Sequence, residues 1–133
     1  MIHGLNHINL RAPKALLDVL RDFYRDVLGL EIGPRPAFNT PGYWLYAGGQ
    51  PVLHLAEQAP DEALRAPAAA PGVFDHTAFT ASDPEATADR LRQHGVAFEV
   101  SRSELTRQHQ FFFSDPAGNG IELNFPFDPN FKG

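Results

Sequence analysis

The stretch FDHTAF, residues 74–79, decides the fold of this chain. It places one histidine, His76, near the start of a short alternation of apolar and polar residues, which is typical of a strand. A near copy, LNHINL at residues 5–10, stands at the beginning of the chain with His7 in the same place. A helical pattern follows each copy. The two stretches therefore predict a duplicated module.

A second possible ligand follows each histidine at almost the same distance. His54 lies 47 positions after His7 (54 − 7), and Glu122 lies 46 positions after His76 (122 − 76). His54 and Glu122 both stand in apolar runs that predict strands. Two strand histidines with matching partners indicate one metal site between the two halves.

The order of predicted elements is the same in both halves. Apolar residues at spacings of three and four predict a helix over 14–28, and Gly29 suits its end. In the second half we expect a helix up to His94, with Ser82 as N-cap and Glu85 completing a capping box. Predicted strands cover residues 3–11, 30–33, 43–47 and 52–56 in the first half and 74–80, 96–100, 110–114 and 120–125 in the second.

These elements predict an α+β fold built from two βαβββ modules. We place module one at residues 1–57, a linker at 58–72, module two at 73–126 and a tail, partly ordered at best, at 127–133. A four-stranded sheet with one helix still has a second face to bury, and pairing two such sheets buries it. We therefore expect a single domain with an incomplete barrel-like cleft lined by the inner faces of the sheets.

Alternation along the first strand assigns a polar face to the predicted cleft. If Ile8 and Leu10 enter the core, then His7, Asn9 and Arg11 share the opposite face. That arrangement is typical of a lined cavity, and the alternative is a face turned to solvent.

Composition limits the possible functions. The 133 residues carry a net charge of −5 without a basic run, which argues against nucleic acid or an anionic membrane as a partner. No apolar run approaches the length of a membrane span and no signal segment is recognisable, so we expect a cytoplasmic protein. There is no cysteine, so any metal must be held by nitrogen and oxygen atoms.

Four residues carry the chemical argument. We interpret His7, His76 and Glu122 as metal ligands, and His54 either as a fourth ligand or as an acid–base residue. Imidazole and carboxylate groups suit Fe(II), Mn, Zn, Ni or Co. A lone strand histidine is more often a hydrogen-bonded core or surface residue, but here the spacing recurs in both halves. His3, His94 and His109 have no symmetric partner.

The chain resembles the vicinal oxygen chelate superfamily, which includes glyoxalase I, extradiol dioxygenases, fosfomycin-resistance transferases and bleomycin-resistance proteins. The matching phrases are NHINL (6–10), FYRDVLGL (23–30), DHTAF (75–79) and DPAGNGIEL (115–123). The resemblance implies paired βαβββ modules, a homodimer, and a divalent metal that chelates two neighbouring oxygens of a substrate. His7, His76 and Glu122 fall on the three shared ligand positions.

The fourth position distinguishes the subfamilies. Extradiol dioxygenases place an acid–base histidine where this chain has His54, but they have a tyrosine where it has Phe112. Glyoxalase I has a glutamate in place of His54, although Glu122 could still act as a base. The fosfomycin transferases have a threonine in place of Asn9, and bleomycin-binding relatives lack the metal set. The resemblance therefore favours a metal-dependent enzyme.

Three functions remain open. The first is extradiol-dioxygenase-like chemistry on a small aromatic diol, with His54 and Glu122 as catalytic residues. The second is a glyoxalase-like isomerase or lyase acting on a dicarbonyl or glutathione adduct, and the third is a non-catalytic small-molecule binding protein. Candidate substrate-binding residues are Asn9, Arg11, Trp44, Arg107 and Phe112.

Overall fold

A computed structural model describes residues 1–58 and 73–133. By their internal contacts the residues form two compact units, 1–70 and 71–133. Except for Gln58, the linker predicted over 58–72 lies outside the described residues.

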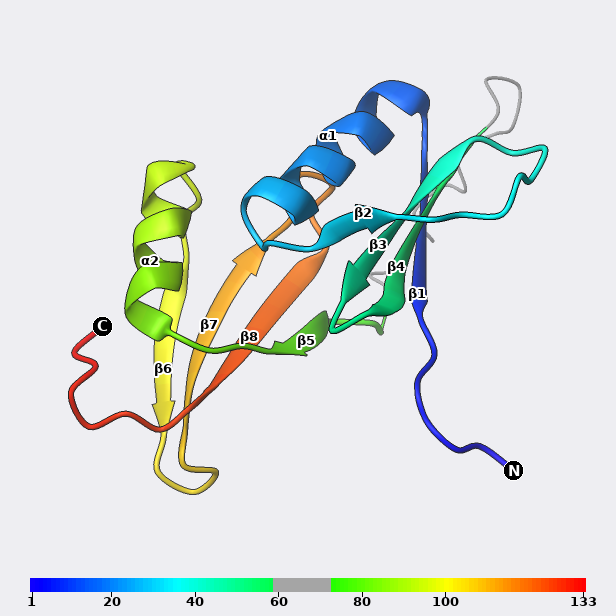
Figure 1. The fold of residues 1–133 in the computed structure, drawn as a ribbon. Helices are drawn as coiled ribbons and strands as arrows, with labels where there is room; N and C mark the ends of the chain where they lie inside the picture. The colour runs from blue at the N-terminus through cyan, green and yellow to red at the C-terminus, as the bar shows by residue number, and fades with distance from the viewer. Residues whose placement is uncertain (59–72) are drawn as a thin grey trace. The chain divides into compact units, whose positions relative to one another are not determined.

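The first unit is a four-stranded sheet with one helix (Figure 1). Its elements are β1 (Ile8–Ala12), α1 (Lys14–Asp26), β2 (Glu31–Gly33), β3 (Gly42–Ala47) and β4 (Gln50–Glu57). The strand order is β1-β4-β3-β2, with β1 parallel to β4 and the other pairs antiparallel. The first and last strands of the unit are therefore neighbours.

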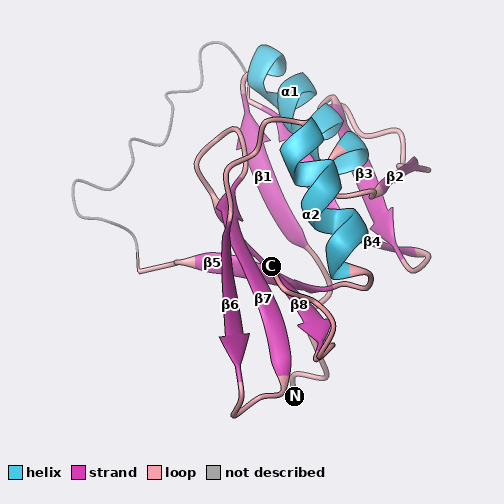
Figure 2. Cartoon of the chain, turned by 90° about the vertical axis from the view of Figure 1, so that its left-hand side faces the viewer, coloured by secondary structure: helices cyan, strands magenta, loops and turns pink. Residues whose placement is uncertain are grey.

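The second unit repeats this topology. Its elements are β5 (His76–Thr80), α2 (Pro84–Gln93), β6 (Glu99–Ser103), β7 (Gln108–Ser114) and β8 (Gly120–Pro126). The order is β5-β8-β7-β6, with β5 parallel to β8, and Figure 2 shows β6 and β7 side by side. The predicted α+β class with two βαβββ units is confirmed. Neither helix, within the described segments, is long and apolar enough to cross a membrane.

Each unit has an apolar core of its own. Helix α1 packs on β1, β3 and β4, with its side chains Leu17, Leu20 and Tyr24 buried. In the second unit, alternate residues of β7 are buried against the apolar residues Ile121, Leu123 and Phe125 of β8, and Phe111 and Phe125 pack with ring centroids 4.7 Å apart. The buried stripe of α1 is the one that the apolar spacing predicts.

Several element ends were predicted wrongly. Strand β1 starts at Ile8, five residues later than predicted. The N-cap of α2 is Asp83 instead of Ser82, because the Asp83 carboxylate accepts from the Ala86 amide at 3.0 Å. Strand β6 starts at Glu99, three residues later than predicted. The delay arises because Gly95, at a φ of 68°, turns the chain so that the Val96 amide closes the helix by donating to the Leu91 carbonyl.

The C-terminal tail makes contacts with the second unit. Phe131 is 5% exposed, and His109 Nε2 donates to the Asp128 carbonyl at 2.8 Å. The His109 ring also stacks on Phe127, with centroids 5.2 Å apart. His109 therefore fixes the tail to β7.

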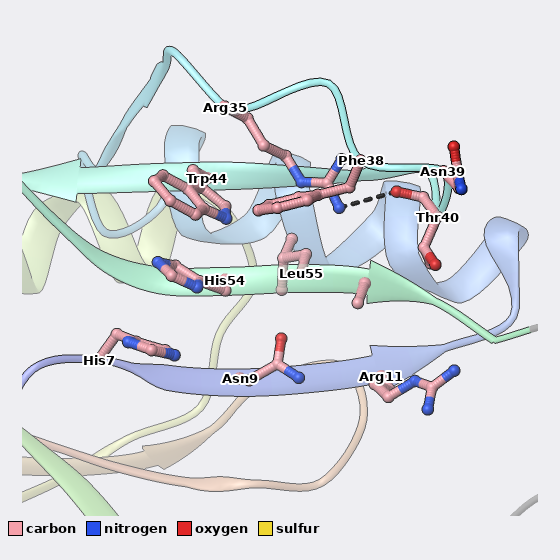
Figure 3. A pocket seen from close by; sticks show the side chains of 11 residues that line it. His7, Asn9, Arg11, Arg35, Phe38, Asn39, Thr40, Trp44, His54 and Leu55 are labelled. Atoms are coloured by element: carbon pink, nitrogen blue, oxygen red, sulfur yellow. Dashed lines mark hydrogen bonds between the residues drawn. The ribbon is translucent and has the colours of Figure 1, made fainter.

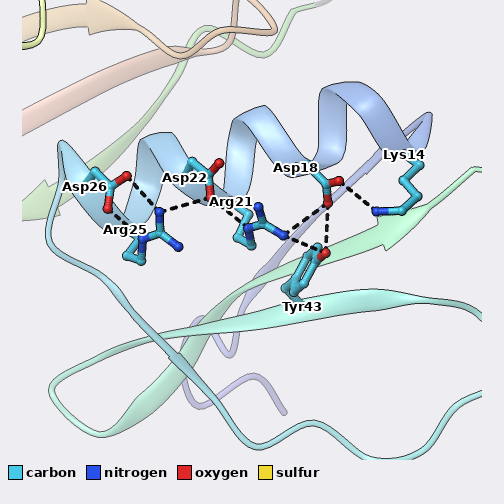
Figure 4. A network of polar contacts seen from close by, with 7 residues as sticks. All are labelled: Lys14, Asp18, Arg21, Asp22, Arg25, Asp26 and Tyr43. Carbon is cyan, nitrogen blue, oxygen red and sulfur yellow. Dashed lines mark hydrogen bonds and ion pairs between the residues drawn. The ribbon is translucent and has the colours of Figure 1, made fainter.

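A polar network joins α1 to β3 (Figure 4). Tyr43 donates its hydroxyl to Asp18 at 2.8 Å and accepts from Arg21 at 2.8 Å, and Lys14 donates to Asp18 at 2.7 Å. The bond from Lys14, and then the one from Tyr43, lowers the pKa of Asp18. The ionised carboxylate therefore stabilises the folded state.

Asp18→Asn should destabilise the protein at neutral pH and have a smaller effect in acid. Because the pKa of Asp18 is lower in the folded state, its carboxylate stabilises the folded protein at pH values above the unfolded pKa of about 4. This stabilisation is lost as the pH falls through the pKa of the folded state. Urea unfolding of the variant and the wild type at pH 7 and pH 3 measures the difference. An equal difference at both pH values would contradict the role of the Asp18 charge.

Gly120 permits the close approach of β5 to β8. A Cβ at this position would collide with the Asp75 carbonyl oxygen and lie 3.1 Å from the Cβ of His76. A larger residue must therefore push the start of β5 away from β8.

Gly120→Ala should lower the free energy of unfolding by about 1–3 kcal/mol because of this overlap. Gly4→Ala is the matched control, since a Cβ at Gly4 meets nothing within 4 Å. Denaturant unfolding of both variants tests the contact. If the two substitutions had equal effects, the tight packing of β5 on β8 would be refuted.

Candidate functional site

The histidines of the two repeated stretches are held in the same way. In the first unit, His7 Nδ1 lies 2.7 Å from Asn6 Oδ1; in the second, His76 Nδ1 lies 2.7 Å from Asp75 Oδ2. Each oxygen accepts, so Nδ1 donates, and the preceding residue orients the ring. Such a bond to Nδ1 commonly fixes a metal-ligating histidine that binds through Nε2.

In the second unit, His76 and Glu122 meet. His76 Nε2 lies 2.7 Å from Glu122 Oε2, and the Glu122 residue is only 7% exposed. A carboxylate oxygen lies at each ring nitrogen of His76, which favours the protonated ring. The hydrogen bond to Asp75, followed by the charge of Glu122, accordingly raises the pKa of His76 against the opposing effect of burial.

Side chains of β7 and β8 fix the other oxygen of Glu122. Gln110 Nε2 donates to Glu122 Oε1 at 2.7 Å and to Asn124 Oδ1 at 3.1 Å. Phe112 stands opposite Glu122 in the β7–β8 register, and its ring meets His76 edge-on at 6.3 Å. The Glu122 carboxylate therefore has one oxygen held by an amide and the other directed at His76.

The first unit contains a pocket of about 590 Å³ (Figure 3). Strand β1 contributes His7, Asn9 and Arg11, as expected for the polar face of the first strand. Further lining residues come from the segment 35–40 and from β3 and β4; they are Arg35, Phe38, Asn39, Thr40, Trp44, His54, Leu55 and Ala56.

Three rings form a row across β1, β4 and β3. The His7 and His54 centroids are 3.8 Å apart at an interplanar angle of 15°, and those of His54 and Trp44 are 4.1 Å apart at 10°. Figure 3 shows the three rings one above another. His54 Nε2 is buried, and no hydrogen-bond partner for it is found in the described part of the chain. An unpaired buried group of this kind costs about 1–3 kcal/mol.

The environment of His54 keeps its ring neutral. Burial, followed by the charges of His7 and Arg35, lowers the pKa of His54. Arg35 donates from an Nη to the Thr40 carbonyl at 2.8 Å, and its guanidinium lies 5.0 Å above the Phe38 ring centroid.

The structure thus groups the predicted residues by unit. The first unit brings five of them together around one pocket: His7, Asn9, Arg11, Trp44 and His54. The second unit groups His76, Phe112 and Glu122. Arg107 lies in the β6–β7 turn, where its guanidinium is 4.8 Å above the Phe127 ring. The roles predicted for these residues remain predictions.

Four residues that make contacts in these two groups were not predicted from the sequence. Asn6 and Asp75 hold the two histidines, and a signal for them was present because each directly precedes its histidine in the repeated stretch. Gln110 and Arg35 had no such signal. Their roles depend on strand register and on the path of an irregular segment.

The donor set suits a divalent metal. His76 Nε2 and Glu122 Oε2 face each other. The other ring nitrogen of His76 is hydrogen-bonded to Asp75, and the other oxygen of Glu122 is hydrogen-bonded to Gln110, so both groups are oriented. His7 has the same arrangement at Nδ1. No group of three or more His, Asp or Glu side chains that could hold a metal occurs among residues 1–58 and 73–133. A site that also uses His7 therefore remains a prediction.

Comparisons with known proteins identify the family. Residues 4–123 match the model of the Glyoxalase/Bleomycin resistance protein/Dioxygenase superfamily. This protein belongs to that superfamily, so the resemblance found in the sequence is confirmed. No curated protein matches the chain.

Solved structures share the fold. A glyoxalase family protein from Bacillus anthracis is 24% identical, with a TM-score of 0.72 over 95% of this chain and 97% of that one. Lactoylglutathione lyase from Agrobacterium tumefaciens is 23% identical, with a TM-score of 0.61 over 92% of each chain. The antibiotic binding protein TnmS3 from a Streptomyces species is 24% identical, with a TM-score of 0.64 over 94% of this chain and 97% of that one.

Gln110→Leu should lower the free energy of unfolding by about 1–3 kcal/mol, because it leaves a buried oxygen of Glu122 without its donor. Thermal or urea unfolding measures the loss. Gln93→Leu, at the exposed end of α2, is the control and should change little. A Gln110 variant as stable as the wild type would argue that this hydrogen bond contributes nothing.

Proposed function

We propose that this protein is a divalent-metal-dependent enzyme that binds a small substrate through two adjacent oxygens, with chemistry of the extradiol-dioxygenase type. The observation that carries the proposal is the pairing of His76 Nε2 with Glu122 Oε2 at 2.7 Å, each group oriented by a further side chain. His7, His76 and Glu122 would hold the ion. Three ligands of this type leave positions open for substrate.

The ion could be Fe(II), Mn, Zn, Ni or Co, since all accept imidazole and carboxylate ligands. A bound divalent ion supplies Lewis acidity, which stabilises negative charge on substrate oxygens. The residues of the chain orient the substrate and move its proton. Superfamily membership supports an enzyme, because lactoylglutathione lyase shares the fold.

We assign proton transfer to His54. His54 lines the pocket, and its buried Nε2 has no hydrogen-bond partner within the described residues, so a substrate hydroxyl that reached this nitrogen would supply the missing partner. Asn9 and Arg11 line the same pocket and would orient the substrate. Phe112, which cannot donate a hydrogen bond, would contribute an apolar surface beside His76.

Two alternatives use the same residues. A glyoxalase-like isomerase or lyase would use Glu122 as the base on a dicarbonyl or glutathione adduct. Non-catalytic binding of a small molecule is favoured by the stacking of His7 on His54, which makes the face of the His7 ring part of an aromatic wall. The antibiotic binding protein TnmS3 has the same fold.

We further propose that the protein forms a homodimer, as the resemblance to the superfamily implies, and that it is cytoplasmic. Its net charge of −5 supports a small molecule, instead of nucleic acid or a membrane, as its partner.

His76→Ala should abolish metal binding, because it removes a ligand and leaves Glu122 Oε2 without its partner. The metal content of protein purified without a histidine tag or chelator measures this, with about one ion per chain expected for the wild type. His94→Ala, at the exposed end of α2, is the control and should bind normally. Normal metal content in the His76 variant would count decisively against the site.

Activity then separates the alternatives. Metal-loaded protein is assayed with catechols and with methylglyoxal–glutathione in the presence of Fe(II), Ni(II) and Zn(II). Oxygen uptake on a catechol supports the proposed chemistry. Isomerase or lyase turnover without oxygen uptake supports the glyoxalase alternative, and ligand binding without metal or turnover supports the binding protein.

A further inference from the structure

The pocket of the first unit is cationic, although the chain as a whole is acidic. Its described lining contains two arginines, two histidines, three neutral hydrogen-bonding residues and four apolar residues, and none of these eleven is acidic. The net charge of the chain is −5. A cavity lined by one sign of charge concentrates ligands of the opposite sign. This pocket therefore favours an anion.

Arg35 is the cation that the structure positions most clearly. Its guanidinium is held between the Thr40 carbonyl, 2.8 Å from an Nη, and the face of the Phe38 ring. Its Nε is buried and has no hydrogen-bond partner in the described part of the chain. None of the ion pairs found among those residues involves Arg35. A planar guanidinium is well suited to a carboxylate.

Flat aromatic surfaces adjoin this charge. Phe38 is 55% exposed, and its ring centroid lies 6.2 Å from that of Trp44, which continues into the row of His54 and His7. Figure 3 shows Phe38 beside Trp44 and below the Arg35 side chain. A tetrahedral anion would use the charge without the rings, whereas a planar ring gains from stacked or edge contacts with both aromatics.

We propose that this pocket binds a monocyclic aromatic carboxylate, with the carboxylate at Arg35 and the ring against Phe38 and Trp44. The inference rests on the proposed function and narrows its substrate class from small oxygenated molecules to aromatic acids. A pocket of about 590 Å³ is large enough for a ligand of this size. Arg35, Phe38 and Trp44 belong to one unit and none of them is a proposed metal ligand, so their part in binding is tested without metal.

The test uses chelator-treated full-length protein and two matched pairs of ligands. Calorimetric titration compares 3,4-dihydroxybenzoate with catechol, which differ in the carboxylate, and benzoate with cyclohexanecarboxylate, which differ in the ring. We expect the aromatic acid of each pair to bind about tenfold more tightly or better. Trp44 is the only tryptophan of the chain, so a change in its fluorescence on adding benzoate reports binding in this pocket.

Variants test the contribution of the Arg35 charge and that of the Phe38 ring separately. Arg35→Met should weaken benzoate binding about tenfold, and Arg35→Lys should restore part of it. Phe38→Leu should reduce the preference for benzoate over cyclohexanecarboxylate. Arg90→Met, on the exposed face of α2, is the matched control and should bind as the wild type does. Far-ultraviolet circular dichroism verifies that each variant is folded.

Each possible result bears on the proposal. Equal affinity for catechol and 3,4-dihydroxybenzoate would overturn the role of the charge, and equal affinity for benzoate and cyclohexanecarboxylate would overturn the role of the rings. Absence of binding to folded wild-type protein would overturn both. These titrations contain no metal, whereas the proposed enzyme fails on metal content and turnover, so the two failures are distinguishable.

Discussion

In each unit the first strand pairs in parallel with the last strand. The positions of the histidines and of their partners depend on this pairing. Parallel neighbours need a crossover connection, and in each unit the chain between them includes a helix and two further strands. The pairing sets β1 against β4 and β5 against β8, so that His7 reaches His54 and His76 reaches Glu122. These contacts join residues more than forty positions apart in the chain.

The two units use this common frame for different chemistry. In the second unit the partner of the histidine is a buried carboxylate, so a ring nitrogen makes the contact and Gln110 is needed to satisfy the other oxygen. In the first unit the partner is a second imidazole, so the rings meet face to face and extend into Trp44. The second unit thus has a polar pair where the first unit, with His54 at the position matching Glu122, has a row of rings.

The repeat and the element order could be predicted because they depend on local patterns. The apolar spacing in α1 and the alternation in β1 placed Leu17 in the core and Asn9 on the pocket face. Arg35 and Phe38 could not be found this way, since the irregular segment between β2 and β3 has no period. Gln110 was missed because its contact with Glu122 depends on the β7–β8 register, and a sequence does not specify register. The position of Asp83 as helix cap depends on a positive φ, which asparagine and aspartate tolerate better than most residues.

The late position of β4 and β8 has a consequence for biosynthesis. A ribosome makes each unit from its first strand to its last, so neither histidine can meet its partner until the final segment of that unit has emerged. Contacts of long sequence separation form slowly, because loop closure must precede them. An incomplete or stalled chain that ends before β8 therefore carries an exposed His76 without Glu122. The contact between His76 and Glu122 therefore forms only after the last strand of the unit has been made.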